Sequence, residues 1–323
     1  MSAARKAIVA VLPFLALVAP LRAQTWPAGP IRMVVPYAAG GATDAFARLI
    51  AGKLQDQMKT TVLVDDKAGA GGNLGTNFVA KSAPDGYTVL FNINGHAISP
   101  ALYKSLPFDA DADFLRVTQL VSTTSVLVVI PGLPVKTFQE LIAYAKANPG
   151  KLTYGSTGIG NSLHLTMEMI KHATGIDIQM APYRGDAPLI SAMLGGEVQL
   201  AVLPMITAMA QIQSGALRPI GVSTIRRAGP LPDVPTIAEQ GLPGFEIQGW
   251  MGLFVPARTP RAIVERLWRE SKLALAAPDV GAVMKNLALE PVGSSPEEFD
   301  TRYFTDRALF ERVVKDANIP LQD

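Results

Sequence analysis

Cysteine is absent from this 323-residue sequence, and only three histidines are present. Without cysteine the chain has no disulfides, no thiolate metal ligands and no cysteine nucleophile. The histidines, His96, His164 and His172, do not have the spacing of a zinc-binding helix motif. We therefore expect neither a metal centre nor any other cofactor.

Clustered basic charge is also absent. Arg5 and Lys6 precede an apolar run over residues 7–21, and Leu21-Arg22-Ala23 follows, which is the pattern of a secretory signal peptide. We expect cleavage near Ala23 and export of the mature protein. The run is too short for a membrane-spanning helix. Removing residues 1–23 leaves 26 of the 29 basic side chains against 27 acidic ones, so nucleic-acid binding is not expected.

Apolar residues make up 49% of the chain, which is enough for a sizeable core. Short β-rich runs alternate with helical patterns, which is typical of parallel βαβ units. We expect strands over 31–36, 61–65 and 87–92 with helices over 43–57 and 73–80. A second set has strands over 125–130, 152–155, 178–181, 198–203 and 217–223, with helices over 137–148, 162–173 and 187–194 and another after 203.

The pattern changes after residue 259 to helices with only a short β run between them, and Ser295 and Glu298 form a capping box before the last helix. The simplest packing returns these helices to the first unit through a strand over 250–255. This predicts an α/β protein with a discontinuous first lobe over 24–124 and 250–323 and a second lobe over 125–249. Two crossing segments then act as a hinge beside a cleft.

Three glycine-rich turns each follow an expected strand and open an expected helix: residues 37–44, 68–75 ("AGAGGNLG") and 156–164 ("STGIGNSLH"). Such turns present free backbone N–H groups and the positive end of a helix dipole to an anion. Glycine can also serve only to permit a tight turn. The first and third turns come from different lobes, so we expect them to meet across the cleft around a small anion.

Motifs of nucleotide sites and of hydrolases are missing. The sixth position of a dinucleotide fingerprint is Leu74 in one turn and Leu163 in another, and no glycine loop is followed by Lys-Ser or Lys-Thr. No serine has glycines two places away on both sides, as the nucleophile elbow requires. Ser162 and His164 are the nearest approach to catalytic machinery, and they keep an exported α/β hydrolase-like enzyme as an alternative.

The whole chain after residue 23 resembles the Bug-type periplasmic receptors of tripartite tricarboxylate transporters. The resemblance is carried by "WPAGPIRMVVPYAAGGATDAFARLIAGKL", "VDDKAGAGGNLGTNFVAKSAPDGYTVL", "YGSTGIGNSLHLTMEMIKHATG", "APYRGDAPLISAMLGGEVQL" and "LRPIGVSTIRRAGPLPDVPTIAEQGLPGFEIQGWMGLFVPARTP". It implies a two-lobed, Venus-flytrap, type 2-like periplasmic binding protein fold. It also implies a non-enzymatic receptor whose first and third loops, here 37–44 and 156–162, grip one carboxylate.

The turns and the resemblance together give a set of candidate ligand-binding residues. Arg184 is a candidate for a second carboxylate of a diacid, or else for a salt bridge to Asp186. Asp44 either stabilises the start of its helix, with Arg48 as partner, or meets an ammonium or hydroxyl of the ligand. The candidates are Tyr37, Ala39, Gly40, Gly41, Thr43, Asp44, Asn94, His96, Ser156, Thr157, Gly158, Gly160, Asn161, Ser162, His164, Tyr183, Arg184, Gly185 and Leu203.

The sequence departs from the family pattern at Tyr37 to Ala39, where Phe and prolines are common, and at Gln199 and Leu203, where acidic residues are frequent. A leucine facing the cleft favours a more apolar ligand. The resemblance implies a small organic carboxylate as ligand, whether di- or tricarboxylate, amino acid or aromatic acid. It also implies a membrane permease as partner, and we expect a monomer. A sensor that acts on a receptor kinase is the alternative to a transport receptor.

Overall fold

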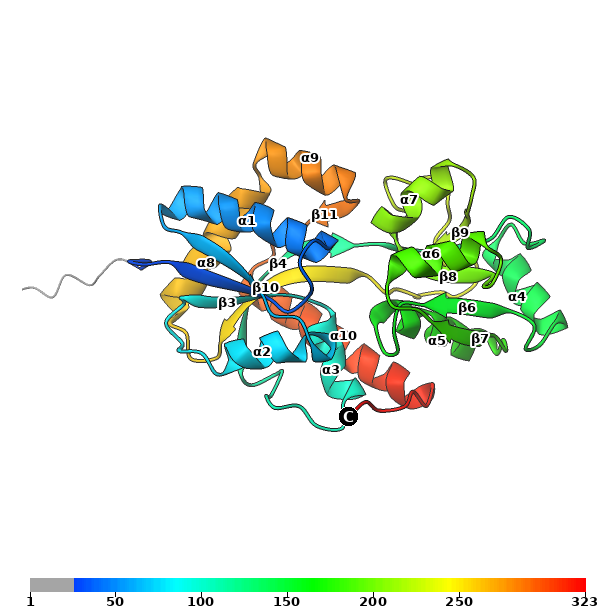
Figure 1. Cartoon of the computed structure of the whole chain (residues 1–323), viewed down its shortest axis with the longest axis horizontal. Coiled ribbons are helices and arrows are strands. Elements are labelled where there is room, and N and C mark those ends of the chain that lie inside the picture. Colours follow the sequence, from blue (N-terminus) through cyan, green and yellow to red (C-terminus); the bar gives the residue numbers. More distant parts are fainter. Residues whose placement is uncertain (1–25) are drawn as a thin grey trace, which may run out of the picture.

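The computed structural model describes residues 26–323, which form two α/β lobes joined by two crossing segments (Figure 1). The predicted signal peptide, residues 1–23, lies outside the described residues. One lobe has a six-stranded sheet in the order β11-β4-β10-β3-β1-β2, and the other has a five-stranded sheet in the order β7-β6-β8-β5-β9. The predicted fold class, two lobes each built on its own sheet, is therefore confirmed.

The first lobe combines two separate parts of the chain. Its N-terminal elements are β1 (Ile31–Val35), α1 (Ala42–Met58), β2 (Val62–Asp66), the short 3-10 helix η1 (Ala70–Gly72), α2 (Asn73–Ala80), β3 (Thr88–Ile93), α3 (Gly95–Leu102) and β4 (Phe114–Thr123). Its C-terminal elements are β10 (Gly249–Pro256), α8 (Arg261–Leu275), α9 (Pro278–Asn286), β11 (Leu289–Pro291) and α10 (Pro296–Asp316). β10 pairs antiparallel with both β3 and β4, so the predicted returning strand is present.

The second lobe is one continuous part of the chain. Its elements are β5 (Ser125–Val129), α4 (Phe138–Ala147), β6 (Thr153–Ser156), α5 (Ser162–Thr174), β7 (Gln179–Pro182), α6 (Asp186–Leu194), β8 (Leu200–Pro204), α7 (Met205–Gln213) and β9 (Arg218–Val222). β6 runs parallel to β7 and β8, as the βα alternation predicts, whereas β5 is antiparallel to both of its neighbours.

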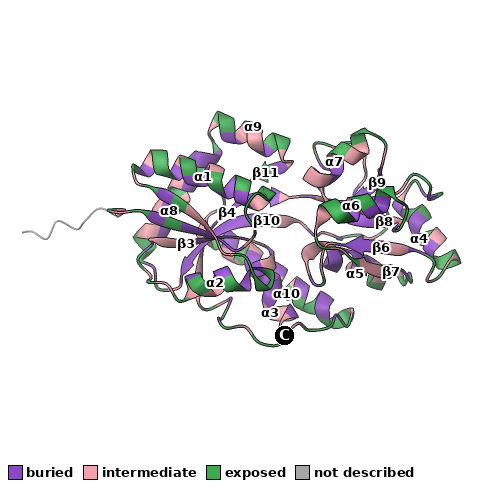
Figure 2. Cartoon of the chain, viewed as in Figure 1, coloured by how far each residue is buried: buried purple, intermediate pink, exposed green. Residues whose placement is uncertain are grey.

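Each sheet is buried on both faces, with the exposed residues concentrated on the outer sides of the helices (Figure 2). In β1, Met33 and Val35 pack into one apolar cluster with α1 and α8, while Val34 packs into the cluster on the other face with α10. This alternation follows from the two-residue period of a strand. In α1, Phe46 and Ile50 lie on the buried face, as the 3.6-residue period of a helix requires.

Two elements of the first lobe were not predicted. α3 contains Pro100, which argues against a helix in any sequence-based prediction. β4 carries buried polar residues, and two of them, Thr118 and Gln119, hydrogen-bond to Ser294 after β11. The Thr118 hydroxyl donates to the Ser294 carbonyl, the backbone N–H of Gln119 donates to the Ser294 hydroxyl, and the Gln119 side chain donates to Ser122 within the strand. The strand shows no alternation of apolar and polar residues.

The predicted capping box of the last helix is present, and α4 has a simpler cap. Ser295 and Glu298 form the full capping box at α10. At α4, Thr137 accepts a hydrogen bond from the backbone N–H of Glu140, but the Glu140 side chain accepts from the backbone N–H of Lys136 instead of closing the box.

The lobes also touch away from the crossing segments. α5 of the second lobe packs against α10 of the first, and Leu165 of α5 belongs to an apolar cluster of the first lobe. The loop before α5 reaches α3, where the Leu102 side chain lies against the backbone of Gly160.

Candidate ligand-binding cleft

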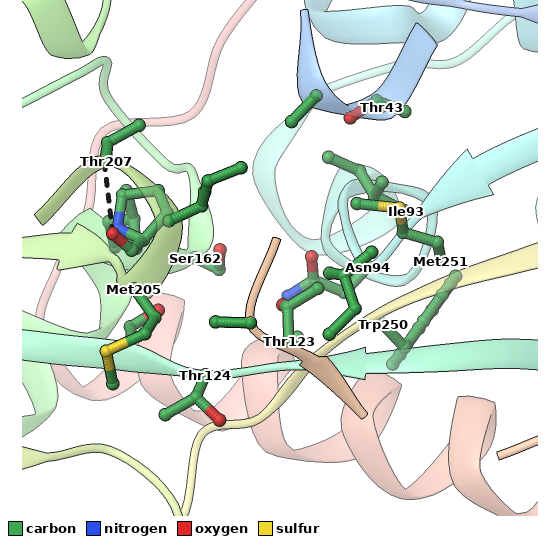
Figure 3. A pocket seen from close by; sticks show the side chains of 18 of the residues that line it. Thr43, Ile93, Asn94, Thr123, Thr124, Ser162, Met205, Thr207, Trp250 and Met251 are labelled. Atoms are coloured by element: carbon green, nitrogen blue, oxygen red, sulfur yellow. Dashed lines mark hydrogen bonds between the residues drawn. The ribbon is translucent and has the colours of Figure 1, made fainter. Parts of the chain in front are cut away.

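A cavity of about 520 Å³ lies between the two lobes. We call it the interlobe cavity. It is lined by both lobes and by both crossing segments: Gly41, Ala42, Thr43, Ile93, Asn94, Thr123, Thr124, Ser125, Thr157, Asn161, Ser162, Leu163, Asp186, Pro204, Met205, Ile206, Thr207, Ile247, Gly249, Trp250, Met251, Leu287, Ala288 and Leu289. Figure 3 shows Ser162, Met205 and Thr207 across the cavity from Thr43 and Asn94. Its volume falls within the range of small-molecule sites.

Helix N-termini surround the interlobe cavity. α1, α3, α5, α6 and α7 each contribute a first-turn or cap residue to its wall, namely Thr43, Asn94, Ser162, Asp186 and Met205. The first turn of a helix leaves backbone N–H groups without intrahelical partners and carries partial positive charge. Converging helix ends of this kind favour an anion.

Formal charge is almost absent from the wall. Of the lining residues within 26–323, none is a lysine, arginine or histidine, and Asp186 is the single ionisable side chain. Burial raises the pKa of the Asp186 carboxyl, and the neighbouring Thr207 hydroxyl partly offsets this. The site therefore offers an anion hydrogen-bond donors and helix dipoles but no ion pair.

Asn94, a predicted site residue, lines the interlobe cavity. It precedes α3 without capping the helix through its side chain, and it is 4% exposed. Its Nδ2 is buried and has no hydrogen-bond partner within the described part of the chain. A buried donor without a partner costs about 1–3 kcal/mol, so Asn94 is a candidate for a hydrogen bond to a ligand or a water.

A smaller cavity of about 220 Å³ adjoins the first. It shares Asn94, Asn161 and Ser162 with the interlobe cavity and is also lined by Tyr37 and Gly160. The phenol of Tyr37 is not free there, because it donates a hydrogen bond of 2.9 Å to Oδ1 of Asn92.

The predicted site residues divide into three groups. Those that line the interlobe cavity are Gly41, Thr43, Asn94, Thr157, Asn161 and Ser162. Those that line only the smaller cavity are Tyr37 and Gly160. Those outside both linings are Ala39, Gly40, Asp44, His96, Ser156, Gly158, His164, Tyr183, Arg184, Gly185 and Leu203.

Asp44 is directed into its own loop. Its Oδ2 accepts a hydrogen bond of 2.8 Å from the backbone N–H of Gly40, and its Oδ1 lies 2.7 Å from Nε of Arg48. Arg48 also pairs with Asp66 at the end of β2. The structure thus supports the helix-stabilising interpretation of Asp44, and the carboxylate anchors the loop that presents Gly41 and Thr43.

Side chains of the third turn form hydrogen bonds to the backbone of the same turn. Asn161 caps α5 by accepting a hydrogen bond from the backbone N–H of His164, and its Nδ2 donates to Oγ1 of Thr157. His164 in turn accepts at Nδ1 from the backbone N–H of Gly160, over 2.9 Å. Ser156 donates to the carbonyl of Gly158. These bonds fix the loop that borders the cavity.

The prediction that His96 binds the ligand is wrong, because His96 lies in the core of the first lobe and not in the cleft. Its ring centroid is 4.9 Å from that of Phe114 and 4.8 Å from that of Phe254. Burial, followed by the nearby charge of Arg116, lowers the pKa of His96 to about 3. The imidazole is therefore neutral and serves as a core ring.

Three predictions for the second lobe need correction. Leu203 is fully buried in the apolar cluster beneath β8, so it does not face the cleft. Tyr183 packs against the same cluster. Arg184 is exposed and outside both cavities, and its anticipated salt bridge to Asp186 is not formed within the described residues. Leu203 lies within β8, and Tyr183 and Arg184 directly follow β7. In a strand, a shift of one residue changes the face on which a side chain lies.

Ser162 and His164 do not form a nucleophile–base pair. Nδ1 of His164 is occupied by the N–H of Gly160, and its Nε2 lies 3.9 Å from Oε1 of Glu168. Burial lowers the pKa of His164. Because Nδ1 accepts from Gly160, the proton of the neutral ring is on Nε2, and neither nitrogen has a free lone pair to activate a hydroxyl, as nucleophilic catalysis requires.

Several lining residues escaped sequence analysis. Thr123, Thr124 and Ser125 form the first crossing segment, whose position was predicted but whose side chains were not considered. Met205 and Thr207 begin α7, and Pro204 between a strand and a helix was a signal for that helix start. Within residues 26–323 no helix has the length and apolarity needed to cross a membrane, and no three His, Asp or Glu side chains are grouped to hold a metal.

Comparison with known sequences places the chain among transport receptors. The sequence model of the tripartite tricarboxylate transporter family receptor matches residues 46–318. A UPF0065 protein encoded between tcbD and tcbE in Pseudomonas sp. strain P51 is 36% identical over 294 residues, which cover 91% of this chain and 88% of that protein. BugT of Bordetella pertussis is 36% identical over 284 residues, covering 87% of each chain.

Solved structures agree with the sequence matches. R. palustris Rpa4515, determined with adipate, is 33% identical with a TM-score of 0.81, over 92% of this chain and 100% of that one. MatC (Rpa3494) from Rhodopseudomonas palustris, determined with bound malate, is 28% identical with a TM-score of 0.77, over 90% of this chain and 100% of that one. Both structures therefore share the fold of this chain.

Proposed function

This chain belongs to the family of tripartite tricarboxylate transporter receptors, of the Bug type, and we propose that it binds a small organic carboxylate in the interlobe cavity for delivery to a membrane permease. Members of this family are solute receptors and not enzymes, which agrees with the separation of Ser162 from any catalytic base.

One observation carries the proposal: helix N-termini from both lobes converge on a cavity whose described lining holds no cation. Backbone N–H groups at helix ends are suited to a carboxylate, because their hydrogen bonds and dipoles act without a counter-ion. The carboxylates named for the two solved relatives, adipate and malate, support the same class of ligand.

We propose specific groups as the carboxylate grip. From the first lobe these are the backbone around Gly41 and Thr43 and the unpartnered Nδ2 of Asn94. From the second lobe they are Thr157 and Ser162 at the start of α5. Donors from both lobes reach one anion only when the lobes are close together, so ligand binding favours the closed form.

We propose a hinge at the two crossing segments. Thr124 separates β4 from β5, and the return crossing enters β10 at Gly249, so few residues join the lobes there. Both segments also line the interlobe cavity. We retain residues 24–124 and 250–323 as the first lobe and 125–249 as the second. Closure about these segments is the hinge motion typical of periplasmic binding proteins.

We further propose that the protein acts in the periplasm after removal of residues 1–23, as a monomer whose closed form docks on the permease. A sensory partner of a receptor kinase uses the same hinge and the same ligand. Deleting the gene distinguishes the two roles: loss of carboxylate uptake supports transport, and intact uptake with a lost transcriptional response supports sensing.

Calorimetric titration tests the binding function. The mature protein is titrated with adipate, malate and other short carboxylates, and the ligand is recovered for mass spectrometry. We expect saturable binding of one ligand per chain and recovery of unchanged ligand. Binding also raises the free energy of unfolding by about 2.7 kcal/mol at a hundredfold excess of ligand over the dissociation constant. Steady conversion of the ligand, or no binding by any carboxylate, contradicts the proposal.

Two asparagines make a matched pair of variants for this titration. Asn94 and Asn73 each precede or begin a helix and each has a buried Nδ2 without a partner, but only Asn94 lines the cavity. Asn94→Leu is expected to weaken carboxylate binding without lowering the stability of the ligand-free protein. Asn73→Leu is expected to leave binding unchanged. Equal affinities for the two variants contradict the assignment of Asn94.

A further inference from the structure

Asp186 is the one ionisable side chain in the described wall of the interlobe cavity. It is the first residue of α6 and is half-buried. Arg184, two residues earlier, is exposed and makes no ion pair with it within the described residues. An acidic residue in a cavity that otherwise favours anions calls for a physical explanation.

The position of Asp186 brings it close to the anion-binding end of α5. β7, which leads to α6, pairs in parallel with β6, which leads to α5. The backbone N–H of Tyr183 donates to the carbonyl of Ser156 over 2.7 Å, so the two loops run side by side beyond the strands. Adjacent strands lie about 4.8 Å apart. A carboxylate bound at Thr157 and Ser162 therefore has Asp186 as a near neighbour in the same cavity.

Two negative groups in this space repel each other, and burial strengthens the repulsion. Burial already raises the pKa of the Asp186 carboxyl, which shows that its charge is poorly solvated. A ligand with a carboxylate at each end adds a further negative charge. A ligand with a carboxylate and an ammonium group instead supplies Asp186 with the cation that the described protein does not.

Helix stabilisation alone explains part of the position. A carboxylate in the first turn of α6 is favoured by the helix dipole wherever its side chain points. Asp279 fulfils the same role in the first turn of α9, where it pairs with Lys53 outside the cavity. Asp186 differs because its side chain borders the ligand space and has no cation beside it.

We propose that Asp186 selects ligands that carry a protonated amine in addition to a carboxylate. The helix N-termini and Asn94 bind the carboxylate, and the Asp186 carboxylate accepts a hydrogen bond from the ammonium group. Asp186 is then the specificity-determining residue of the cavity. This inference rests on the proposed function and narrows its ligand class to amino acids.

The test uses matched ligands and matched variants in calorimetric titrations. One ligand series has six carbons and differs only at the far end: 6-aminohexanoate, hexanoate and adipate. A second series tests an amine next to the carboxylate: leucine and 4-methylpentanoate. The proteins are the wild type, Asp186→Asn and, as the control for loss of a first-turn carboxylate, Asp279→Asn.

We expect the wild type to bind the amine-bearing member of at least one series about tenfold or more tightly than its partners, as a charge-assisted hydrogen bond allows. Asp186→Asn removes this preference by weakening the amine-bearing ligand, whereas hexanoate binds the variant at least as tightly as it binds the wild type, because the repulsion between the two carboxylates is gone. Adipate binds Asp186→Asn more tightly than it binds the wild type. Asp279→Asn keeps the preference.

Two results overturn the inference. The first is a wild type that shows no preference for the amine in either series. It then binds hexanoate or adipate as tightly as 6-aminohexanoate, and it also binds 4-methylpentanoate as tightly as leucine. The second is an Asp186→Asn variant that weakens all ligands equally, which is the effect of a purely structural carboxylate. In both cases carboxylates still bind, so the receptor function stands. Absence of binding by every member of both series contradicts the receptor function itself and the inference with it.

Discussion

Substitution of Asp44 separates loop anchoring from ligand contact. The Asp44 carboxylate holds the backbone N–H of Gly40 at 2.8 Å and lies 2.7 Å from Nε of Arg48. Together these contacts fix the turn that places Gly41 and Thr43 at the interlobe cavity. Asp44→Ala removes both contacts, whereas Asp44→Asn keeps an oxygen that can accept from Gly40.

The magnitude follows from the separate contributions. A hydrogen bond to a charged acceptor contributes about 1.5–3 kcal/mol. A carboxylate in the first turn of a helix adds about 0.3–1 kcal/mol. The ion pair adds little, because Arg48 keeps Asp66 as a partner. Asp44 also raises the pKa of Asp66, after the larger effect of burial, so its removal relieves some repulsion. We expect Asp44→Ala to lower the free energy of unfolding by about 2–3 kcal/mol and Asp44→Asn by about 1 kcal/mol or less.

Urea unfolding and calorimetry measure the two consequences. Because Asp44 acts on the loop and not on the ligand, Asp44→Ala should weaken 6-aminohexanoate and hexanoate by the same factor. Asp44→Asn should bind both nearly as the wild type does. A loss confined to 6-aminohexanoate would refute this reasoning, since it would place the carboxylate against the ligand's ammonium. Equal destabilisation by Ala and Asn would also refute it, because only Asn keeps the acceptor.

Other substitutions test the surroundings of the cleft. Gly160→Ala should destabilise the protein by about 1–2 kcal/mol, because the backbone of Gly160 is left-handed. The loss should be larger still, because the added Cβ would lie 2.1 Å from a leucine of α3. The control Gly132→Ala, whose Cβ would meet open space, should change the urea unfolding curve little. His96→Leu should remove a pH dependence of stability, because burial lowers the pKa of His96 in the folded protein to about 3 from 6.5. The free energy of unfolding of the wild type should therefore fall as pH drops below 6.5, by up to about 1.4 kcal/mol per pH unit. The same dependence of this free energy on pH in the variant would contradict the assignment. Trp250→Phe leaves the buried carboxylate of Asp306 without the 2.8 Å hydrogen bond from Nε1. Thermal unfolding should show a loss of about 1–3 kcal/mol in the free energy of unfolding. If a ligand-induced change in tryptophan fluorescence persists in this variant, its source is another tryptophan.

The sequence was sufficient for the βα alternation of both lobes, except for α3 and β4, and for the two glycine turns that border the cavity. Alternation of strands and helices predicted both βα units, and the helical C-terminal part required a strand that returns to the first lobe, which is β10. The first and third glycine turns do face one cavity through Thr43 and Ser162. These predictions rest on local pattern and on chain connectivity, both of which a sequence contains.

Side-chain direction was the part that local pattern could not supply. Asp186 was considered only as a partner for Arg184, because the two are close in sequence, yet one lines the cavity and the other is exposed. His96 lies two residues after Asn94, which lines the cavity, but its ring packs among aromatic side chains of β4, β10 and α10. Tertiary packing decides both cases, and residues far apart in the sequence determine it.

A crystal structure of the protein with a bound carboxylate tests the central claim most directly. The account predicts carboxylate oxygens within hydrogen-bond distance of backbone N–H groups at the starts of α1 and α5 and of Nδ2 of Asn94, with no lysine or arginine side chain at that distance. A ligand carboxylate paired with a lysine or arginine, or a ligand bound outside the interlobe cavity, would contradict it.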